Sequence, residues 1–405
     1  MKNEFLPVLR FAICSDAHIE GVNAPGYLRL KKAIDYSLAF AKKAEGYNKL
    51  DTFIIAGDTT NKGTKDEFAA FKEIFDDAQS KGLKLLCTVA RGHDSITMKK
   101  KSLVHFKSLT NQETDFHRVI GGYHFIGLST CRFIYNKNYL LYQKQWIKNQ
   151  FKKAVSDTPD KPVFFIHHEH VKNTVYGSSD FDGWGNRFFT GVADKYPNVV
   201  DFSGHSHYPV NDPRSIWQGA FTAIGTGSLK YTELTVDDER KVHPATCEAC
   251  SNFLIVEADK DGNLHIMGFD CLAEEMLCEH YLSNPADKKN REFTWEKQRS
   301  RSKAPAFDIN AEISFKEENG IYTAEYPKAQ STDGKPIFIY RAYVYDEKGK
   351  AVAESKTVPS YYLYKPEEIV VTELGKLKNG RYTIKVFAEN CFGMKSQPIE
   401  KEIII

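Results

Sequence analysis

Apolar runs and amphipathic segments alternate through the first part of the chain. Short apolar runs predict buried β-strands at residues 11–14, 51–56 and 84–90. Between them, residues 27–43 and 65–80 carry apolar side chains at helical spacing. Strands that alternate with helices in this way favour right-handed crossovers and a largely parallel sheet.

A second set of strand patterns follows the first. Residues 116–120 and 123–129 predict a hairpin that turns at Gly121-Gly122. Further elements are expected in this order: a helix at 141–155, strands at 163–166 and 199–203, and a hairpin made by 253–258 and 264–269. The first domain is therefore expected to be α/β and to end near residue 285.

From residue 306 the pattern changes to short strands separated by Gly, Pro and Asp-Gly turns. Strands are expected at 309–315, 321–325, 337–345, 368–372, 380–389 and 398–405. About a hundred residues of this kind predict a β-sandwich. Residues 286–305 are rich in Lys and Arg and lack apolar periodicity, so they predict a solvated linker. The expected organisation is a domain at 1–285, a linker at 286–305 and a second domain at 306–405.

Composition adds only exclusions to this picture. The 405 residues include 55 basic and 53 acidic side chains, a formal net charge of +2. This balance gives no general attraction to nucleic acid, so we expect no nucleic-acid partner. No apolar run reaches the roughly 18–20 residues that a transmembrane helix needs. Residues 1–10 do not have the pattern of a signal peptide, which favours a cytoplasmic location.

Eight cysteines leave several interpretations open. Cys14 and Cys87 lie in apolar strand patterns and are expected in the core. Four others could form a zinc site together with His243 or His280, and they are Cys247, Cys250, Cys271 and Cys278. A Cys250–Cys271 disulfide and buried free thiols are the alternatives.

Carboxylate and imidazole side chains follow the predicted strands at their carboxyl ends, where ligands bind in open α/β sheets. They are Asp16, His18, Asp58, His93, His167, His205 and His207. Mixed imidazole and carboxylate ligands suit Zn²⁺, Mn²⁺ or Fe better than Ca²⁺ or Mg²⁺. Because the set exceeds what one four-coordinate ion requires, it predicts two divalent metal ions.

The order of these fragments resembles that of the calcineurin-like metallophosphoesterases. The resemblance covers roughly residues 8–230 and rests on five fragments: Asp16-Ala17-His18, Gly57-Asp58, Arg91-Gly92-His93-Asp94, His167-His168 and Gly204-His205-Ser206-His207. It implies a four-layer α/β/β/α sandwich with a dinuclear metal centre at the strand ends. The C-terminal strands resemble immunoglobulin-like or fibronectin type III modules, so a smaller all-β sandwich is expected there.

The resemblance also implies a role for each matching residue. The first metal ion would be bound by Asp16, His18 and His207, the second by His167 and His205, and Asp58 would bridge the two. The implied catalytic residues are His93, which would assist phosphate binding or protonate the leaving oxygen, and Asp94, which would orient it. Arg91 and His168 are expected to bind substrate.

Two positions depart from the family pattern. An Asn that binds the second metal in the family is missing, because Gly92 is followed directly by His93. We therefore expect the second metal to bind more weakly. The Pro that commonly follows the His pair is also absent, and His168 and His170 could line the pocket. The glycine- and aromatic-containing segment 176–186 is compatible with a lid, with a substrate-recognition segment or with an ordinary surface loop.

The expected function is metal-dependent hydrolysis of small phosphodiesters or phosphomonoesters by a hydroxide that bridges the metal ions. One alternative is a pseudoenzyme that binds a phosphate ligand and has lost catalysis with the Asn. Another is a nuclease on the same metal centre, which would want a basic groove and stacking aromatic residues.

Overall fold

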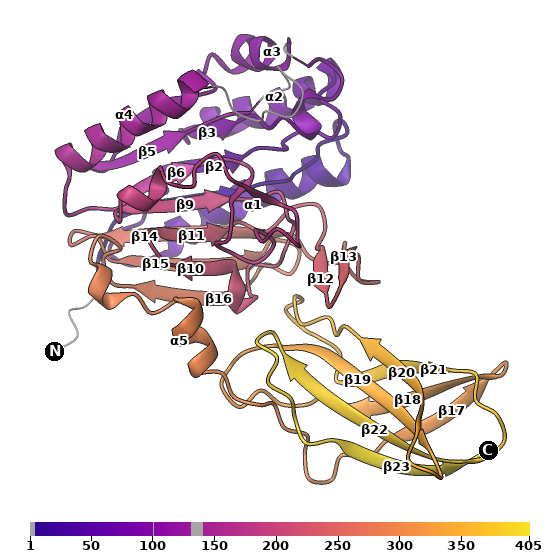
Figure 1. Ribbon diagram of the computed structural model, residues 1–405. Helices are drawn as coiled ribbons and strands as arrows, with labels where there is room; N and C mark the ends of the chain where they lie inside the picture. The colour runs from indigo at the N-terminus through magenta and orange to yellow at the C-terminus, as the bar shows by residue number, and fades with distance from the viewer. Residues whose placement is uncertain (1–4, 100, 131–140) are drawn as a thin grey trace. The chain divides into compact units, whose positions relative to one another are not determined.

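The computed structural model describes residues 5–99, 101–130 and 141–405. The chain divides into two compact units, Met1–Trp295 and Glu296–Ile405, and each is described by itself. The first unit is mixed α/β, with several sheets and few helices (Figure 1).

The first sheet of this unit has six strands. Its order is β16 (Glu275–Leu282), β15 (Leu264–Asp270), β14 (Asn252–Asp259), β1 (Pro7–Cys14), β2 (Thr52–Ala56) and β3 (Leu85–Thr88). The strands β1, β2 and β3 are parallel, as their helical crossovers require, whereas β14 pairs antiparallel with β1. The predicted hairpin of β14 and β15 is confirmed.

The second sheet also has six strands. Its order is β10 (Ile216–Gln218), β11 (Thr222–Gly225), β9 (Val199–Ser203), β6 (Val163–Ile166), β5 (Tyr123–Gly127) and β4 (Phe116–Ile120). The predicted β4–β5 hairpin is confirmed, and β5, β6, β9 and β11 run parallel. Two short pairs lie outside these sheets: β7 (His170–Val171) with β8 (Gly185–Asn186), and β12 (Leu234–Val236) with β13 (Glu239–Val242).

Local sequence signals mark where the first two helices begin. Pro25 occupies the first turn of α1 (Pro25–Lys43), where its missing N–H costs nothing. Thr64 and Glu67 form a capping box at the start of α2 (Lys65–Ser80). These helices and α4 (Leu141–Asp157) confirm the predicted ones, whereas α3 (Lys101–Thr110) was not predicted.

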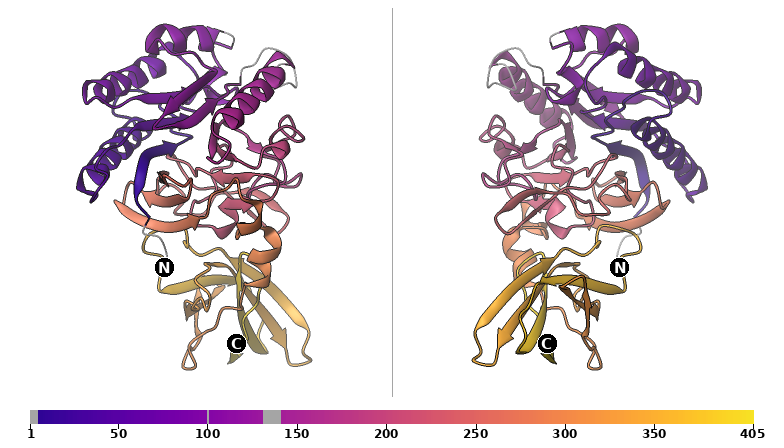
Figure 2. Two further views of the ribbon diagram at one scale, coloured as in Figure 1. Left: turned by 90° about the vertical axis from the view of Figure 1, so that its left-hand side faces the viewer. Right: turned by 90° about the vertical axis from the view of Figure 1, so that its right-hand side faces the viewer.

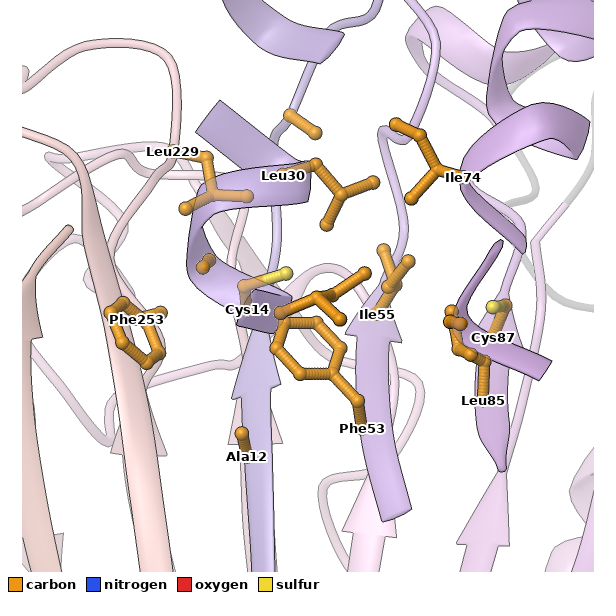
Figure 3. Packing of buried hydrophobic residues seen from close by; sticks show 14 of the residues in the cluster. Ala12, Cys14, Leu30, Phe53, Ile55, Ile74, Leu85, Cys87, Leu229 and Phe253 are labelled. Carbon is orange, nitrogen blue, oxygen red and sulfur yellow. The ribbon is translucent and has the colours of Figure 1, made fainter. Parts of the chain in front are cut away.

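Successive side chains of a strand point to opposite faces of its sheet, so alternate residues of β1 belong to two different hydrophobic clusters. Phe11 and Ile13 of β1 pack with Phe164 and Phe202 of the second sheet, so this cluster lies between the sheets. The intervening side chains face the helices α1 and α2 in the cluster of Figure 3, which includes Ala12, Cys14, Phe53, Ile55, Leu30 and Ile74.

The outer face of the second sheet is covered by α4. Phe165 of β6 packs there with Ile147 and Phe151 of the helix. The views in Figure 2 show α1 and α2 on one side of the strands and α4 on the other. The loops at the carboxyl ends of β1, β2, β6 and β9 therefore start from two sheets that share a core.

The second unit consists of two antiparallel sheets. One is β17 (Ser314–Glu318), β18 (Ile321–Pro327) and β21 (Ile369–Gly375), and the other is β20 (Ala351–Thr357), β19 (Ile337–Asp346), β22 (Arg381–Asn390) and β23 (Ile399–Ile404). Both sheets contribute to one buried cluster. Residues 309–313 were predicted as strand and are not, and β20 was not predicted. The likeness to immunoglobulin or fibronectin modules stays a prediction.

Three other expectations can be compared with the described residues. The segment 286–305 contains a 3₁₀ helix at Lys288–Asn290 and the helix α5 (Trp295–Ser300). The four cysteines considered for a zinc site or a disulfide are free thiols: Cys250 Sγ lies 3.0 Å from Thr232 Oγ1, and Cys271 Sγ points to the carbonyl of Arg29. None of the described helices is long and apolar enough to cross a membrane.

Candidate metal centre

The polar residues predicted at the strand ends come together because their loops are hydrogen-bonded to one another. The N–H of Asp16 donates to Gly57 O at 3.1 Å and that of His18 to Asp58 O at 3.0 Å, which joins the loops after β1 and β2. The N–H of His205 donates to Asp16 Oδ2 at 3.0 Å, which adds the loop after β9.

Five side chains of the centre sit on left-handed backbone. The φ angles of Asp16, His18, Asp58, His205 and His207 are 54°, 47°, 47°, 72° and 59°. Non-glycine residues in this region cost of order 1 kcal/mol or more each and concentrate at functional sites. The surrounding hydrogen bonds hold these residues in a conformation that their side chains disfavour.

Asp16, His18 and His207, here called the first triad, bring three donor atoms to one point. His207 Nε2 lies 3.2 Å from Asp16 Oδ1 and 3.3 Å from His18 Nε2, and the third edge is 3.8 Å. Ligand atoms around a four-coordinate ion lie roughly 3.3 Å apart, because metal–ligand bonds are about 2.0–2.2 Å long. The spacing of the first triad therefore fits a metal ion.

Asp58, His168 and His205, the second triad, show the same spacing. His168 Nε2 lies 3.1 Å from Asp58 Oδ2 and 3.1 Å from His205 Nδ1. The two triads are adjacent, because His168 Nε2 is 3.8 Å from Asp16 Oδ1. A third set of donors, His18, Asp58 and His93, overlaps both triads.

One buried oxygen has the environment expected of a metal ligand. Asp16 Oδ1 accepts no hydrogen bond from the described residues, although three imidazole nitrogens lie within 3.8 Å of it. A buried carboxylate oxygen without a partner is costly. A cation between Asp16 and the surrounding imidazoles would satisfy it, so the donor set fits divalent metal ions that accept nitrogen and oxygen ligands.

Charges in the centre are strongly perturbed. Burial alone would raise the pKa of Asp16, but His207 and His168 lower it well below its ordinary value. Burial alone would lower the pKa of His168, yet Asp58 and Asp16 raise it to about 10. Burial lowers the pKa of His18 and of His205 to about 4. Without metal, a proton on His168 balances the two carboxylates, and a bound cation would replace it.

His167 differs from its expected place and lies in none of the three donor groups. Its Nε2 is 2.5 Å from Asp201 Oδ1, and its ring stacks on Phe165 with centroids 4.5 Å apart. The second triad contains His168, which was expected to bind substrate, in the place where His167 was expected. The reason is strand alternation: His167 continues the face of Phe165, whereas His168 continues the inter-sheet face of Ile166.

The loop after β3 lies against Asp58. The N–H of His93 donates to Asp58 Oδ1 at 2.9 Å, and His93 Nδ1 lies 2.7 Å from Asn61 O. Buried Asp94 accepts hydrogen bonds from Thr60 N at 2.8 Å and Ala90 N at 3.0 Å, so it fixes the loop itself. Burial, and then the charge of Asp58, raise the pKa of Asp94 to about 6.

Gly92 and Arg91 belong to the same loop after β3. A Cβ placed on Gly92 would lie 3.1 Å from both carboxylate oxygens of Asp58. Gly92 therefore stands directly beside the carboxylate of the second triad. Arg91 donates its backbone N–H to Thr130 Oγ1 at 2.6 Å, and its role in substrate binding stays a prediction.

Two aromatic side chains flank the triads. Trp184 lies in the segment 176–186, for which a lid, a recognition segment and a surface loop were left open. Its ring meets the His205 ring edge-on, with centroids 4.9 Å apart, and Lys241 Nζ lies 4.4 Å from the centroid of the Trp184 ring. Tyr231, which was not predicted, lies 4.2 Å from the ring of His207. No sequence signal marked Tyr231, since it follows no predicted strand.

No protein-family model matches the sequence, and no curated protein matches it. Among solved structures the chain is similar to a purple acid phosphatase from yellow lupin (Lupinus luteus) seeds: identity is 12%, the match covers 70% of this chain and 54% of that one, and the TM-score is 0.45. The chain thus spans about half the length of the lupin protein.

Two further matches are shorter. A twitchin kinase region from C. elegans shares 15% identity over 26% of this chain and 17% of that one, with a TM-score of 0.18. A hypothetical protein from Pyrococcus horikoshii OT3 shares 13% identity over 26% and 96% of the two chains, with a TM-score of 0.17. These scores are too low to assign a fold or a function, whereas the buried Asp and His groups of the chain itself could hold metal ions.

Proposed function

We propose that the chain is a metal-dependent phosphoesterase that hydrolyses small phosphodiesters or phosphomonoesters. The observation that supports this most is the pair of adjacent triads, whose donor atoms are spaced as metal ligands and mix imidazole with carboxylate. Within this proposal the first unit is a calcineurin-like metallophosphoesterase domain with four layers, helix, sheet, sheet and helix.

The protein would hold two divalent ions, with Mn, Fe and Zn as the candidates. Asp16, His18 and His207 would bind one, and Asp58, His168 and His205 the other. When bound, such ions lower the pKa of coordinated water and neutralise phosphate oxygens during an in-line displacement.

Within this proposal His93 would move a proton. Its Nδ1–H donates to the carbonyl of Asn61, which fixes the ring and directs Nε2 away from that carbonyl. A protonated Nε2 could donate to the departing oxygen of the ester. Asp94 acts as a positioning residue, because its hydrogen bonds to Thr60 and Ala90 fix the loop that carries His93.

Gly92 determines how many protein donors the second ion would have. Asp58 also shares a donor group with His18 and would serve the first ion as a fourth donor, whereas glycine supplies no side-chain ligand beside Asp58 and leaves the second ion with three. Three donors with an open position suit a catalytic ion but bind it less tightly. We expect titration of the metal-depleted protein with Mn²⁺ to show one tight and one weaker site, with activity rising as the weaker site fills. One tightly held ion, and no activity with added Mn²⁺, would contradict this.

The direct test compares an aryl phosphate with a bis-aryl phosphate as substrates in the presence of Mn²⁺. Asp58→Asn should lower either activity at least about a hundredfold, because the bound cation supplies several kcal/mol of transition-state stabilisation. The matched control is Asp76→Asn, which changes an exposed carboxylate on α2 and should leave activity unchanged. Activity that persists in Asp58→Asn would refute the proposal, and the ratio of the two substrates separates diesterase from monoesterase.

A second candidate is a phosphate-binding protein without catalysis. Gly92 favours it, because the position beside Asp58 provides no ligand. It predicts that metal-loaded protein binds inorganic phosphate in calorimetry but turns over neither aryl ester. Turnover abolished by Asp58→Asn would exclude it.

A further inference from the structure

A chain of buried polar side chains runs beneath the loop that carries His205 and His207. Its members are at most 3% exposed and are His167, Asp201, Ser203, His170 and Ser206. His167 Nε2 lies 2.5 Å from Asp201 Oδ1, and Ser203 Oγ lies 3.3 Å from Asp201 Oδ2. The ring of His170 bridges two hydroxyls, with Ser203 Oγ 2.9 Å from Nδ1 and Ser206 Oγ 2.7 Å from Nε2.

The carboxylate of Asp201 gives this chain one direction. A carboxylate only accepts, so Ser203 donates its single hydrogen to Asp201 and must accept from His170 Nδ1–H. The neutral ring then offers Nε2 to the hydroxyl of Ser206, whose oxygen accepts the N–H of Tyr208 at 3.3 Å. The donor and acceptor roles of each hydrogen bond thus follow from those of the one before it, from Asp201 in β9 to Ser206 in the His205–His207 loop.

Ser206 connects this chain to both triads. It stands between His205 of the second triad and His207 of the first, and both neighbours have left-handed backbone with φ of 72° and 59°. While these two side chains face the candidate centre, the hydroxyl of Ser206 is bonded to His170. A strained loop that carries one ligand for each ion needs such an external restraint.

We propose that Asp201, Ser203, His170 and Ser206 form a positioning network that fixes the His205–His207 loop and thereby sets the affinity of both metal positions; this rests on the proposed metal centre. Polar side chains that orient metal ligands typically change metal affinity 10- to 100-fold when they are mutated. If these residues served only to fill space, apolar side chains would do so without the cost of burying polar groups. Packing alone therefore does not explain why they are polar.

The test is a double-mutant cycle on the full chain, read out as binding of Mn²⁺ to metal-depleted protein by calorimetry. Ser206→Ala and Asp201→Asn should each weaken binding of both ions about 10- to 100-fold. The Mn²⁺ affinity of the double variant should be no lower than that of the single variant with the lower affinity. Interrupting the row of hydrogen bonds at either end already releases the loop, so a second interruption adds nothing. The matched control is Ser37→Ala, a buried serine that bonds to Ala33 O on α1, and it should bind Mn²⁺ as the wild type does.

Two results would overturn the proposal: wild-type Mn²⁺ affinity in Ser206→Ala, or affinity losses that simply add in the double variant. If Asp201→Asn does not fold, Ser203→Ala replaces it in the same cycle. The absorption spectrum of bound Co²⁺ gives a second readout, because a displaced loop should shift the ligand-field bands. Since ion binding is measured directly, the cycle decides the role of the network whether or not the protein hydrolyses phosphate esters.

Discussion

His168 joins the two triads. Its Nε2 lies 3.1 Å from Asp58 Oδ2 and from His205 Nδ1, and 3.8 Å from Asp16 Oδ1. Its Nδ1 is 2.9 Å from the carbonyl of Ala56, which fixes the ring and directs Nε2 to the carboxylates. A metal-ligating His commonly donates its other nitrogen to a backbone carbonyl in this way.

If the two proposed Mn²⁺ ions bind, we expect His168→Gln to reduce their number to one and to lower the proposed phosphoesterase activity at least about a hundredfold. His105→Gln, on α3 and outside the three donor groups, serves as the matched control and should keep both ions. The measurement is metal content by atomic spectroscopy after equilibrium dialysis. Two ions retained in His168→Gln would show that His168 is not a ligand.

At the scale of elements, a buried ion pair joins β1 to β14 in the first sheet. Arg10 Nε lies 2.7 Å from Glu257 Oε1, and both side chains are buried. Arg10 also lies over the rings of Phe40 and Tyr47 at 5.8 and 5.6 Å. The pair therefore ties the central strand of this sheet to its antiparallel neighbour and to the segment after α1.

Removing one partner should cost far more than removing both. Arg10→Met leaves the buried Glu257 carboxylate with His265, whose Nδ1 lies 3.3 Å from Glu257 Oε2, as its remaining partner, and we expect it to lower the free energy of unfolding by about 3 kcal/mol. The double variant Arg10→Met with Glu257→Leu should recover much of this loss, because no unpaired charge remains. Denaturant unfolding measures both variants, and a double variant no more stable than Arg10→Met would contradict the explanation.

The β4–β5 hairpin carries two histidines in contact. His117 Nε2 lies 2.8 Å from His124 Nδ1, and the groups around them are Gln150, Asp157, Lys153 and Arg118. Burial lowers the pKa of both histidines, and for His124 the charge of His117 lowers it further. Both rings are therefore less protonated in the folded chain than in the unfolded chain.

The sign of the pH effect follows from this difference. Below a pH of about 6.5 these two histidines bind more protons in the unfolded chain than in the folded chain, so their contribution to stability should fall as the pH decreases from 6.5 and should not change above it. Each proton contributes at most about 1.4 kcal/mol per pH unit. His117→Gln should therefore reduce this slope. Unfolding free energies of the wild type and the variant between pH 5 and 8 test it, and parallel curves would contradict it.

At the scale of the whole molecule, the two compact units have separate hydrophobic cores. Three clusters lie within Met1–Trp295, and one cluster, which includes Tyr326, Tyr340 and Ile384, lies within Glu296–Ile405. The residues of both triads belong to the first unit. Metal binding should therefore not require the second unit.

We expect residues 1–295 and 296–405, expressed separately, each to unfold in one cooperative transition, because each retains its own buried cluster. The first fragment should bind Mn²⁺ with the affinity of the full chain. Calorimetric unfolding and metal titration measure these outcomes. A 1–295 fragment that folds but has lost both ions would show that the second unit contributes to the centre.

The sequence alone predicted the strands and helices around the centre and most of the donor residues that the structure brings together there. Apolar runs and helical spacing depend on local geometry, and Asp16, His18, Asp58, His205 and His207 each follow a strand that the pattern predicts. The tertiary structure decided the remainder. Whether His167 or His168 faces the ligands depends on which face of β6 meets the other sheet, because adjacent residues of a strand point to opposite sides. The rings of Tyr231 and Trp184 contact those of His207 and His205, which come from other segments of the chain. The hydrogen bond between His170 and Ser206 also joins two segments. No local sequence pattern encodes contacts of this kind.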